Sequence, residues 1–128
     1  MTRDWELPED LTASAFARAR VREALTGIGL TDEVLEEAEL IASELAANAV
    51  RYGNTPYALH IEAAPSRVRI SVSNHGSTED PRLIDAEIYS HHGRGLAIVE
   101  ALADSLGWAR DGDRLDVWAD LRVAPSSD

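Results

Sequence analysis

The first half of the chain contains two stretches in which apolar residues recur every three or four positions. Residues 12–30, TASAFARARVREALTGIGL, predict a helix that stops at Gly27 and Gly29. Residues 31–53 open on a Thr or Asp cap, carry acidic residues in the first turn and end at Gly53. They predict a second, longer helix.

The pattern then changes from helical spacing to strict alternation. Residues 57–63 and 68–72 alternate apolar with polar or small side chains around the short turn APSR. This pattern predicts an antiparallel hairpin with one buried face. The further predicted elements are a helix over residues 95–107, a strand over 113–123, and short strands around Trp108 and over residues 5–8.

Three helices combined with an antiparallel sheet predict an α/β two-layer sandwich, with the helices on one face of the sheet. We expect a single domain over residues 1–128, with its core at about 5–123 and a short disordered tail, APSSD, at the end. The other sheet face is expected to be solvated by Arg67, Arg69, Asp116, Asp120 and Arg122.

Composition excludes several kinds of chemistry. The chain has no cysteine, and its 12 basic residues are all arginine, which excludes thiolate nucleophiles, a P-loop lysine and a Schiff-base lysine. A net charge of -11 argues against binding nucleic acid. No apolar run is long enough to span a membrane and no secretory signal is seen, so we expect no membrane association and a cytoplasmic location.

Two polar residues interrupt the apolar side of the second helix. Glu44 and Asn48 lie one turn apart in ELAANAVRYG, within a sector that faces inward as much as outward. A carboxylate there needs a position at the rim or a partner, such as Arg51 or Arg94. The pair alone therefore also fits a purely structural role.

The region after the hairpin adds further polar and glycine residues. Asn74 continues the inward face of its strand, and a loop of about twenty residues follows it, longer than most loops without a function. The loop ends in HHGRGL, which places Gly93, Arg94 and Gly95 at a helix start where free N–H groups attract anions. A GRG sequence alone is also ordinary turn chemistry.

The order of these features resembles the GHKL ATPase fold, in the branch of small bacterial anti-sigma factors that are also serine kinases. SELAANAV resembles the N box of that family and HGRGLAIVE its G2 box, with residues 77–92 as the ATP lid. The resemblance extends over about residues 5–123. It implies bound ATP and Mg²⁺, with Asn48 as the magnesium ligand and Glu44 as the general base that accepts a proton from a serine hydroxyl. The implied nucleotide-binding residues are Asn48, Arg51, Asn74, Gly76, Gly93, Arg94, Gly95 and Leu96.

The sequence departs from the family pattern on the adenine side. Asn74 stands where the family usually has an aspartate that accepts a hydrogen bond from the adenine amino group, so a charge-assisted bond becomes a neutral one. Ser77 and Thr78 stand in place of a frequent second glycine. Leu115 replaces a threonine that many members carry in the last strand.

The resemblance implies an anti-sigma regulatory factor that binds a sigma factor and a STAS-type anti-anti-sigma protein, and phosphorylates the latter on serine. It also makes a homodimer possible. The alternative is a partner-switching binding module of the same fold with weakened or lost nucleotide binding and no kinase activity. A sensor-kinase catalytic domain is favoured less.

Three of the four histidines, His75, His91 and His92, lie around the long loop. They lack a carboxylate at a fixed helical spacing, which makes them a poor metal site. We therefore predict no transition-metal site.

Overall fold

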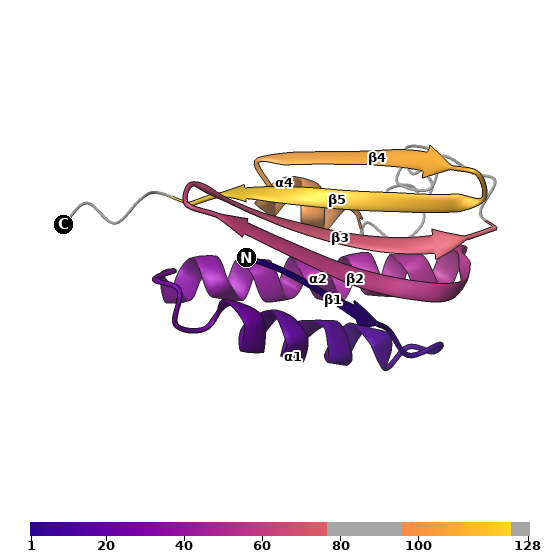
Figure 1. Ribbon diagram of the computed structural model, residues 1–128, viewed down its shortest axis with the longest axis horizontal. Helices are drawn as coiled ribbons and strands as arrows, with labels where there is room; N and C mark the ends of the chain where they lie inside the picture. Colours follow the sequence, from indigo (N-terminus) through magenta and orange to yellow (C-terminus); the bar gives the residue numbers. More distant parts are fainter. Residues whose placement is uncertain (77–95, 124–128) are drawn as a thin grey trace.

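The computed structural model describes residues 1–76 and 96–123, which form five strands and three helices (Figure 1). The strands pair in the order β1-β2-β3-β5-β4, and every neighbouring pair is antiparallel. The elements are β1 (Thr2–Glu6), α1 (Ala13–Leu25), α2 (Asp32–Tyr52), β2 (Asn54–Ala64), β3 (Arg67–His75), α4 (Leu96–Leu102), β4 (Ser105–Asp111) and β5 (Arg114–Arg122).

The three described helices lie on one side of the sheet, and the core fills the space between the two layers (Figure 1). Ile41 and Leu45 of α2, and Leu59, Ile70 and Val117 of the sheet, are almost fully buried. The predicted α/β two-layer sandwich is therefore confirmed. None of the described helices is both long and apolar enough to cross a membrane.

Helix α2 begins where the sequence predicts. The Thr31 side chain accepts a 3.2 Å hydrogen bond from the backbone N–H of Val34, and Asp32 and Glu33 occupy the first turn, where carboxylates favour the helix dipole. The helix ends with the N–H of Gly53 donating to the carbonyl of Ala49 at 2.8 Å.

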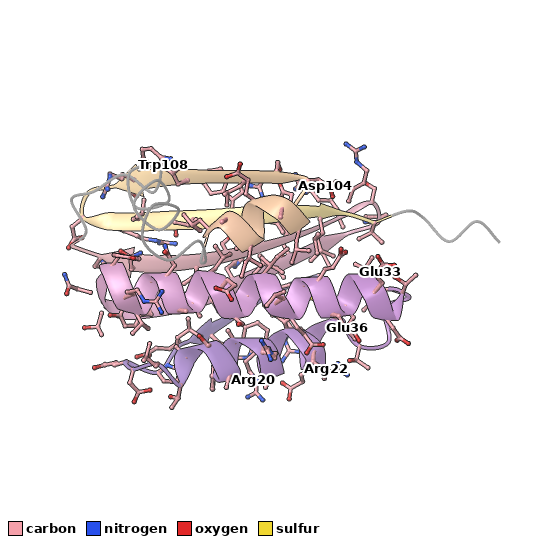
Figure 2. The ribbon with its side chains drawn as sticks, turned by 180° about the vertical axis from the view of Figure 1, so that it is seen from behind. Arg20, Arg22, Glu33, Glu36, Asp104 and Trp108 are labelled. Carbon is pink, nitrogen blue, oxygen red and sulfur yellow. The ribbon has the colours of Figure 1, made fainter. Side chains whose placement is uncertain are left out.

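Polar contacts fix α1 against α2. Arg22 of α1 forms a 2.8 Å ion pair with the nearly buried Glu39 of α2, and Arg18 donates a 3.3 Å hydrogen bond to the Ser43 hydroxyl. Figure 2 shows the two helices side by side, with Arg22 labelled. These contacts set the register of the helix pair, because sliding one helix by a turn would separate each charged group from its partner.

The hairpin of β2 and β3 follows the predicted alternation. Leu59 pairs with Val72 and Ile61 with Ile70, so each pair contributes two apolar side chains to the same face. The register is irregular between Asn54 and Ala58, the part of β2 that lies opposite the end of β3.

Two predicted elements are corrected by the structure. The helix expected over residues 95–107 ends at Leu102, and Ser105–Gly107 belong to β4. Their backbone pairs with β5, and the N–H of Asp104 already donates to the carbonyl of Asp120 at 2.8 Å. The short strand expected over residues 5–8 is β1, which begins at Thr2 and ends at Glu6.

Candidate functional site

The site begins on α2, where Glu44 and Asn48 lie one helical turn apart. Asn48 is only 6% exposed, and its Oδ1 atom has no hydrogen-bond partner within residues 1–76 and 96–123. Glu44 is half-buried and makes no ion pair with Arg51 or any other described residue. The ion pair with Arg51 that a purely structural role would favour is therefore not formed.

A second unpartnered oxygen lies at the end of β3. Asn74 is 4% exposed, as the strand alternation predicts, and its Oδ1 also lacks a partner in the described part of the chain. Its cross-strand neighbour on β5 is Leu115, which is 2% exposed and offers no polar group. Two further buried atoms lack a hydrogen bond in the described part, Arg20 Nε and Glu39 Oε2, and the latter is ion-paired with Arg22. Buried polar groups are nearly always hydrogen-bonded in proteins, so the two amide oxygens on the facing elements α2 and β3 indicate a place for a ligand.

Gly53 connects the two asparagines. A Cβ atom at this position would lie 2.3 Å from both Cγ and Oδ1 of Asn74, so the Asn74 amide occupies the space that any other residue would fill. The backbone of Gly53 is extended, with φ -121° and ψ -176°, and does not itself require glycine. Asn48 lies five residues earlier, about 7.5 Å along the helix axis. Both oxygens therefore lie toward the same end of α2.

Sequence reasoning assigned Gly53 only the role of ending the helix and missed this contact. The signal in the sequence is a glycine directly after ELAANAVRY. Its importance becomes visible only when the end of β3 is placed beside it.

Tyr57 holds the end of α2 in place. Its hydroxyl donates a 3.1 Å hydrogen bond to the carbonyl of Gly53, and its side chain is buried. Burial raises the pKa of the Tyr57 hydroxyl above its usual range, and the Glu9 carboxylate raises it further. The hydroxyl therefore keeps its proton, and with it this hydrogen bond, throughout the neutral range.

Two other predicted residues lie near this end of the sheet. Gly76 has a left-handed φ of 70°, which favours glycine, and its N–H donates to the carbonyl of Asp113 at 2.9 Å. A Cβ there would lie 2.8 Å from the Asn54 amide nitrogen. Arg51 is exposed in the last turn of α2.

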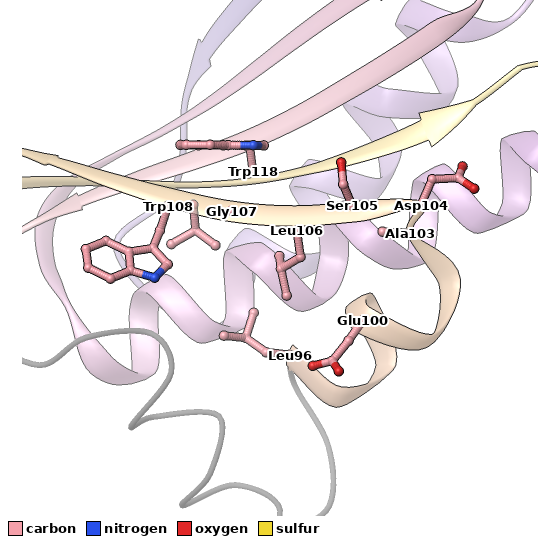
Figure 3. A pocket seen from close by; sticks show the side chains of 10 residues that line it. Leu96, Glu100, Ala103, Asp104, Ser105, Leu106, Gly107, Trp108 and Trp118 are labelled. Atoms are coloured by element: carbon pink, nitrogen blue, oxygen red, sulfur yellow. The ribbon is translucent and has the colours of Figure 1, made fainter.

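Leu96 starts α4 and is 1% exposed. It lines a cavity of about 630 Å³ between α4 and β4, together with Glu100, Leu106, Trp108 and Val117 (Figure 3). Neither Glu44, Asn48 nor Asn74 lines this cavity. Size favours the α4–β4 cavity as a binding place, whereas the unpartnered oxygens favour the space between α2 and β3. We base the candidate site on the oxygens, because an unsatisfied buried acceptor points to a specific chemistry and a volume does not.

The remaining predicted residues, Gly93, Arg94 and Gly95, and the predicted lid over residues 77–92 lie outside the described residues. So do His91 and His92. Within the described ranges, no group of three or more His, Cys, Asp or Glu side chains is placed to hold a metal ion.

The described residues fit Mg²⁺ and a nucleotide. Magnesium prefers hard oxygen ligands, few of them from the protein, and completes its shell with water and phosphate oxygens. The Oδ1 atom of Asn48 is such a ligand, already buried and unpartnered. Asn74 offers a second buried amide oxygen without a partner in the described part of the chain, at the end of β3.

The sequence also matches a protein-family model, that of the histidine kinase-like ATPase domain, over residues 7–120. This chain belongs to the histidine kinase-like ATPase family. The predicted GHKL-type domain is thereby confirmed. The match includes α2, β3 and most of β5, the three elements that carry Asn48, Asn74 and Leu115.

Solved structures support the same fold. The crystal structure of the RsbU and RsbW domains of Rv1364c from Mycobacterium tuberculosis matches with a TM-score of 0.74 and 21% identity, covering 98% of this chain and 33% of that one. The NMR structure of the histidine kinase domain of the E. coli osmosensor EnvZ matches with a TM-score of 0.55 and 19% identity, covering 98% and 91%. This chain thus spans about a third of the mycobacterial chain. No curated protein sequence matches it.

Proposed function

We propose that this histidine kinase-like ATPase domain binds Mg-ATP between α2 and the end of β3. The observation that supports the proposal is the pair of buried, unpartnered oxygens, Asn48 Oδ1 and Asn74 Oδ1. Leaving a buried acceptor unsatisfied costs about 1–3 kcal/mol. A metal ion at Asn48 and a base at Asn74 would remove that cost in the bound state.

Each predicted residue then has a distinct task. Asn48 holds Mg²⁺, and Asn74 contacts the base. Arg51, Gly76 and Leu96 lie around the nucleotide, and Gly93, Arg94 and Gly95 belong to the same proposed set. ATP supplies the phosphoryl group. In the proposed transfer, a serine oxygen of the partner bonds to the γ-phosphorus as the bond to ADP breaks, and the Glu44 carboxylate accepts the serine proton.

We further propose that the protein is a cytoplasmic anti-sigma factor that binds a sigma factor, and that the phosphorylated protein is a STAS-type anti-anti-sigma partner. The support is the resemblance of the ELAANAVRYG segment to the anti-sigma branch, together with the family match. The net charge of -11 suits a basic sigma-factor surface and does not suit nucleic acid. A homodimer is compatible with this proposal.

Titration calorimetry with Mg-ATP tests nucleotide binding. We expect the wild type to bind and Asn48→Ala to lose about 10–100-fold in affinity, as removal of a charge-assisted interaction predicts. Ser71→Ala is the control, because Ser71 is a polar residue on the opposite face of β3 from Asn74. No heat of binding by the wild type at millimolar Mg-ATP would refute the proposal.

Transfer of label from radioactive ATP to a STAS-domain partner tests the kinase step. Glu44→Gln keeps the size of the side chain but cannot accept the proton, so we expect the phosphorylation rate to fall by at least about 100-fold while Mg-ATP affinity changes less than about threefold. A parallel loss of affinity and transfer would instead make Glu44 a structural residue.

A partner-binding module without nucleotide is the second candidate. The observation that favours it is Leu115, which is buried beside Asn74 where many family members offer a hydroxyl. On this hypothesis the protein binds its partners equally well with and without Mg-ATP. Binding of a STAS-domain partner, measured with and without nucleotide, separates the two candidates.

A further inference from the structure

We propose that the base site accepts 6-oxopurines, such as guanine, as well as adenine, because its polar contact is an amide rather than a carboxylate. The inference rests on the proposed nucleotide-binding function. It concerns one residue of this chain, Asn74.

Around Asn74, the inward face of the described sheet carries a single polar side chain, that of Asn74 itself. Asn74 is 4% exposed with an unpartnered Oδ1, and the inward neighbours on β3 and β5 are Val72, Leu115 and Val117. Leu115 lies directly across from Asn74 and has nothing to donate or accept. Discrimination between bases at this wall therefore depends on the Asn74 amide.

A carboxylate and an amide treat the two purines differently. A carboxylate only accepts hydrogen bonds, so it pairs with the 6-amino group of adenine and repels the 6-oxo group of guanine. An amide has one acceptor and one donor group. Adenine presents a donor at position 6 and an acceptor at position 1, and guanine presents the reverse order. The amide is complementary to adenine in one orientation and to guanine in the other.

Within the described part of the chain, no hydrogen bond holds Oδ1 of Asn74 in one orientation. The amide lies tightly against Gly53, where a Cβ atom would approach Cγ and Oδ1 to 2.3 Å. A half-turn about the last side-chain bond exchanges Oδ1 and Nδ2 within the same planar outline. Because the unpartnered Oδ1 has no hydrogen bond to break, the half-turn costs no contact to Oδ1 within the described part of the chain.

Equilibrium binding of Mg-ATP, Mg-GTP and Mg-ITP, measured by calorimetry, tests the inference. We expect the three affinities of the wild type to agree within about tenfold, because either amide orientation makes neutral hydrogen bonds of similar strength. Inosine has the 6-oxo group of guanine without its 2-amino group, so the ITP measurement isolates the edge that Asn74 would contact.

Two variants complete the test. Asn74→Asp should weaken Mg-GTP at least tenfold relative to Mg-ATP, and Asn74→Ala should weaken both nucleotides while leaving their ratio within about threefold of the wild-type ratio. Thermal unfolding shows whether each variant is folded. If the buried carboxylate prevents Asn74→Asp from folding, the Asn74→Ala variant tests the inference by itself, because a loss of affinity for Mg-ATP alone would overturn it.

The outcomes separate this inference from the proposed function. Wild-type binding of Mg-ATP at least 100-fold tighter than Mg-GTP would overturn the inference and leave the proposed function standing. An unchanged ratio in a folded Asn74→Asp variant would do the same. If the wild type binds none of the three nucleotides, the proposed function itself fails.

Discussion

The polar side chains on the two faces of the sheet are partnered in opposite ways. On the outer face, the outer cluster of Arg69, Ser105 and Asp120 is fully paired. Both Asp120 oxygens accept hydrogen bonds, from Arg69 at 2.7 and 2.9 Å and from Ser105 at 2.9 Å. On the inner face, the inner pair of Asn48 and Asn74 keeps its Oδ1 atoms unpartnered in the described part of the chain.

Both faces also use a glycine to admit a large side chain. On the outer face, the Trp118 ring lies against Gly107, 2.6 Å from where a Cβ of that residue would be (Figure 3). The Arg69 guanidinium stacks on the same ring, 5.1 Å from its centroid. On the inner face, Gly53 admits Asn74. The outer glycine admits a ring that packs on the paired Arg69, whereas the inner glycine positions the Asn74 amide, whose oxygen has no partner in the described part of the chain. We infer that the outer cluster serves stability and the inner pair serves a ligand.

Breaking the outer cluster should give the largest loss of stability. Asp120→Asn removes the charge that pairs with Arg69, and because Arg69 is 30% exposed we expect the free energy of unfolding to fall by about 2–3 kcal/mol rather than by the full cost of a fully buried pair. Urea denaturation measures it. Asp116→Asn, which affects the more exposed pair with Arg114, should cost less than about 1 kcal/mol. Neither variant should alter nucleotide affinity.

Filling the space at Gly53 should cost less stability but should also affect the ligand. Gly53→Ala forces Asn74 to move, and we expect a loss of about 1–2 kcal/mol together with weaker Mg-ATP binding. Gly107→Ala is the matched control, because it crowds Trp118 on the outer face and should reduce stability alone. The double variant Gly53→Ala, Asn74→Ala should recover most of the lost stability. Equal loss of nucleotide affinity in both glycine variants would contradict the assignment.

Acid should weaken the outer cluster in a defined pH range. The hydrogen bonds from Arg69 lower the pKa of Asp120 below 3.8, the ordinary value for an aspartate, while burial opposes them and the hydrogen bond from Ser105 lowers the pKa further. A lowered folded-state pKa gives stability that is present above pH 3.8 and is lost as the pH falls through the folded value. Below pH 4, the free energy of unfolding of the wild type should therefore fall more steeply than that of Asp120→Asn. The difference in stability between the two proteins should then be smaller than it is at neutral pH. Parallel curves would argue against the pairing.

A smaller loss of stability than at Gly53 or Asp120 is expected at Tyr57. Tyr57→Phe removes the hydrogen bond to the Gly53 carbonyl and should cost about 1 kcal/mol. Thermal or urea unfolding measures this loss, and calorimetry should show a weaker Mg-ATP interaction because Gly53 positions Asn74. Unchanged stability would mean that the end of α2 is fixed by other contacts.

Local patterns were sufficient to predict most of the fold. The alternation in β2 and β3 and the capped, amphipathic α2 depend on neighbours in the sequence, and both elements formed where expected. The helix expected over residues 95–107 is replaced by strand β4 from Ser105 onward. The apolar spacing there also fits a strand, and the pairing with β5, which is distant in the sequence, determines which of the two forms. Strand β1 carries little apolar pattern, since it depends on pairing with β2.

The candidate site was predictable to a similar extent. The inward position of Asn74 follows from strand periodicity alone, whereas helix periodicity placed Asn48 in a sector that faces inward as much as outward. The contribution of Gly53 was missed because it concerns free space beside a residue 21 positions away, and neither spacing nor composition reports such space. The roles proposed for Glu44 and Asn48 stay predictions.

The most direct test of the inner pair uses the side-chain amides themselves. The chain has asparagine only at positions 48, 54 and 74 and has no glutamine, so a ¹⁵N spectrum contains the side-chain NH₂ groups of these residues alone. Asn→Ala variants assign them. On titration with Mg²⁺ and a non-hydrolysable ATP analogue, we predict that the Asn48 and Asn74 resonances shift and that Asn54 shifts least. Asn48 and Asn74 resonances that stay unchanged at millimolar nucleotide would contradict the assignment of these two oxygens to a ligand.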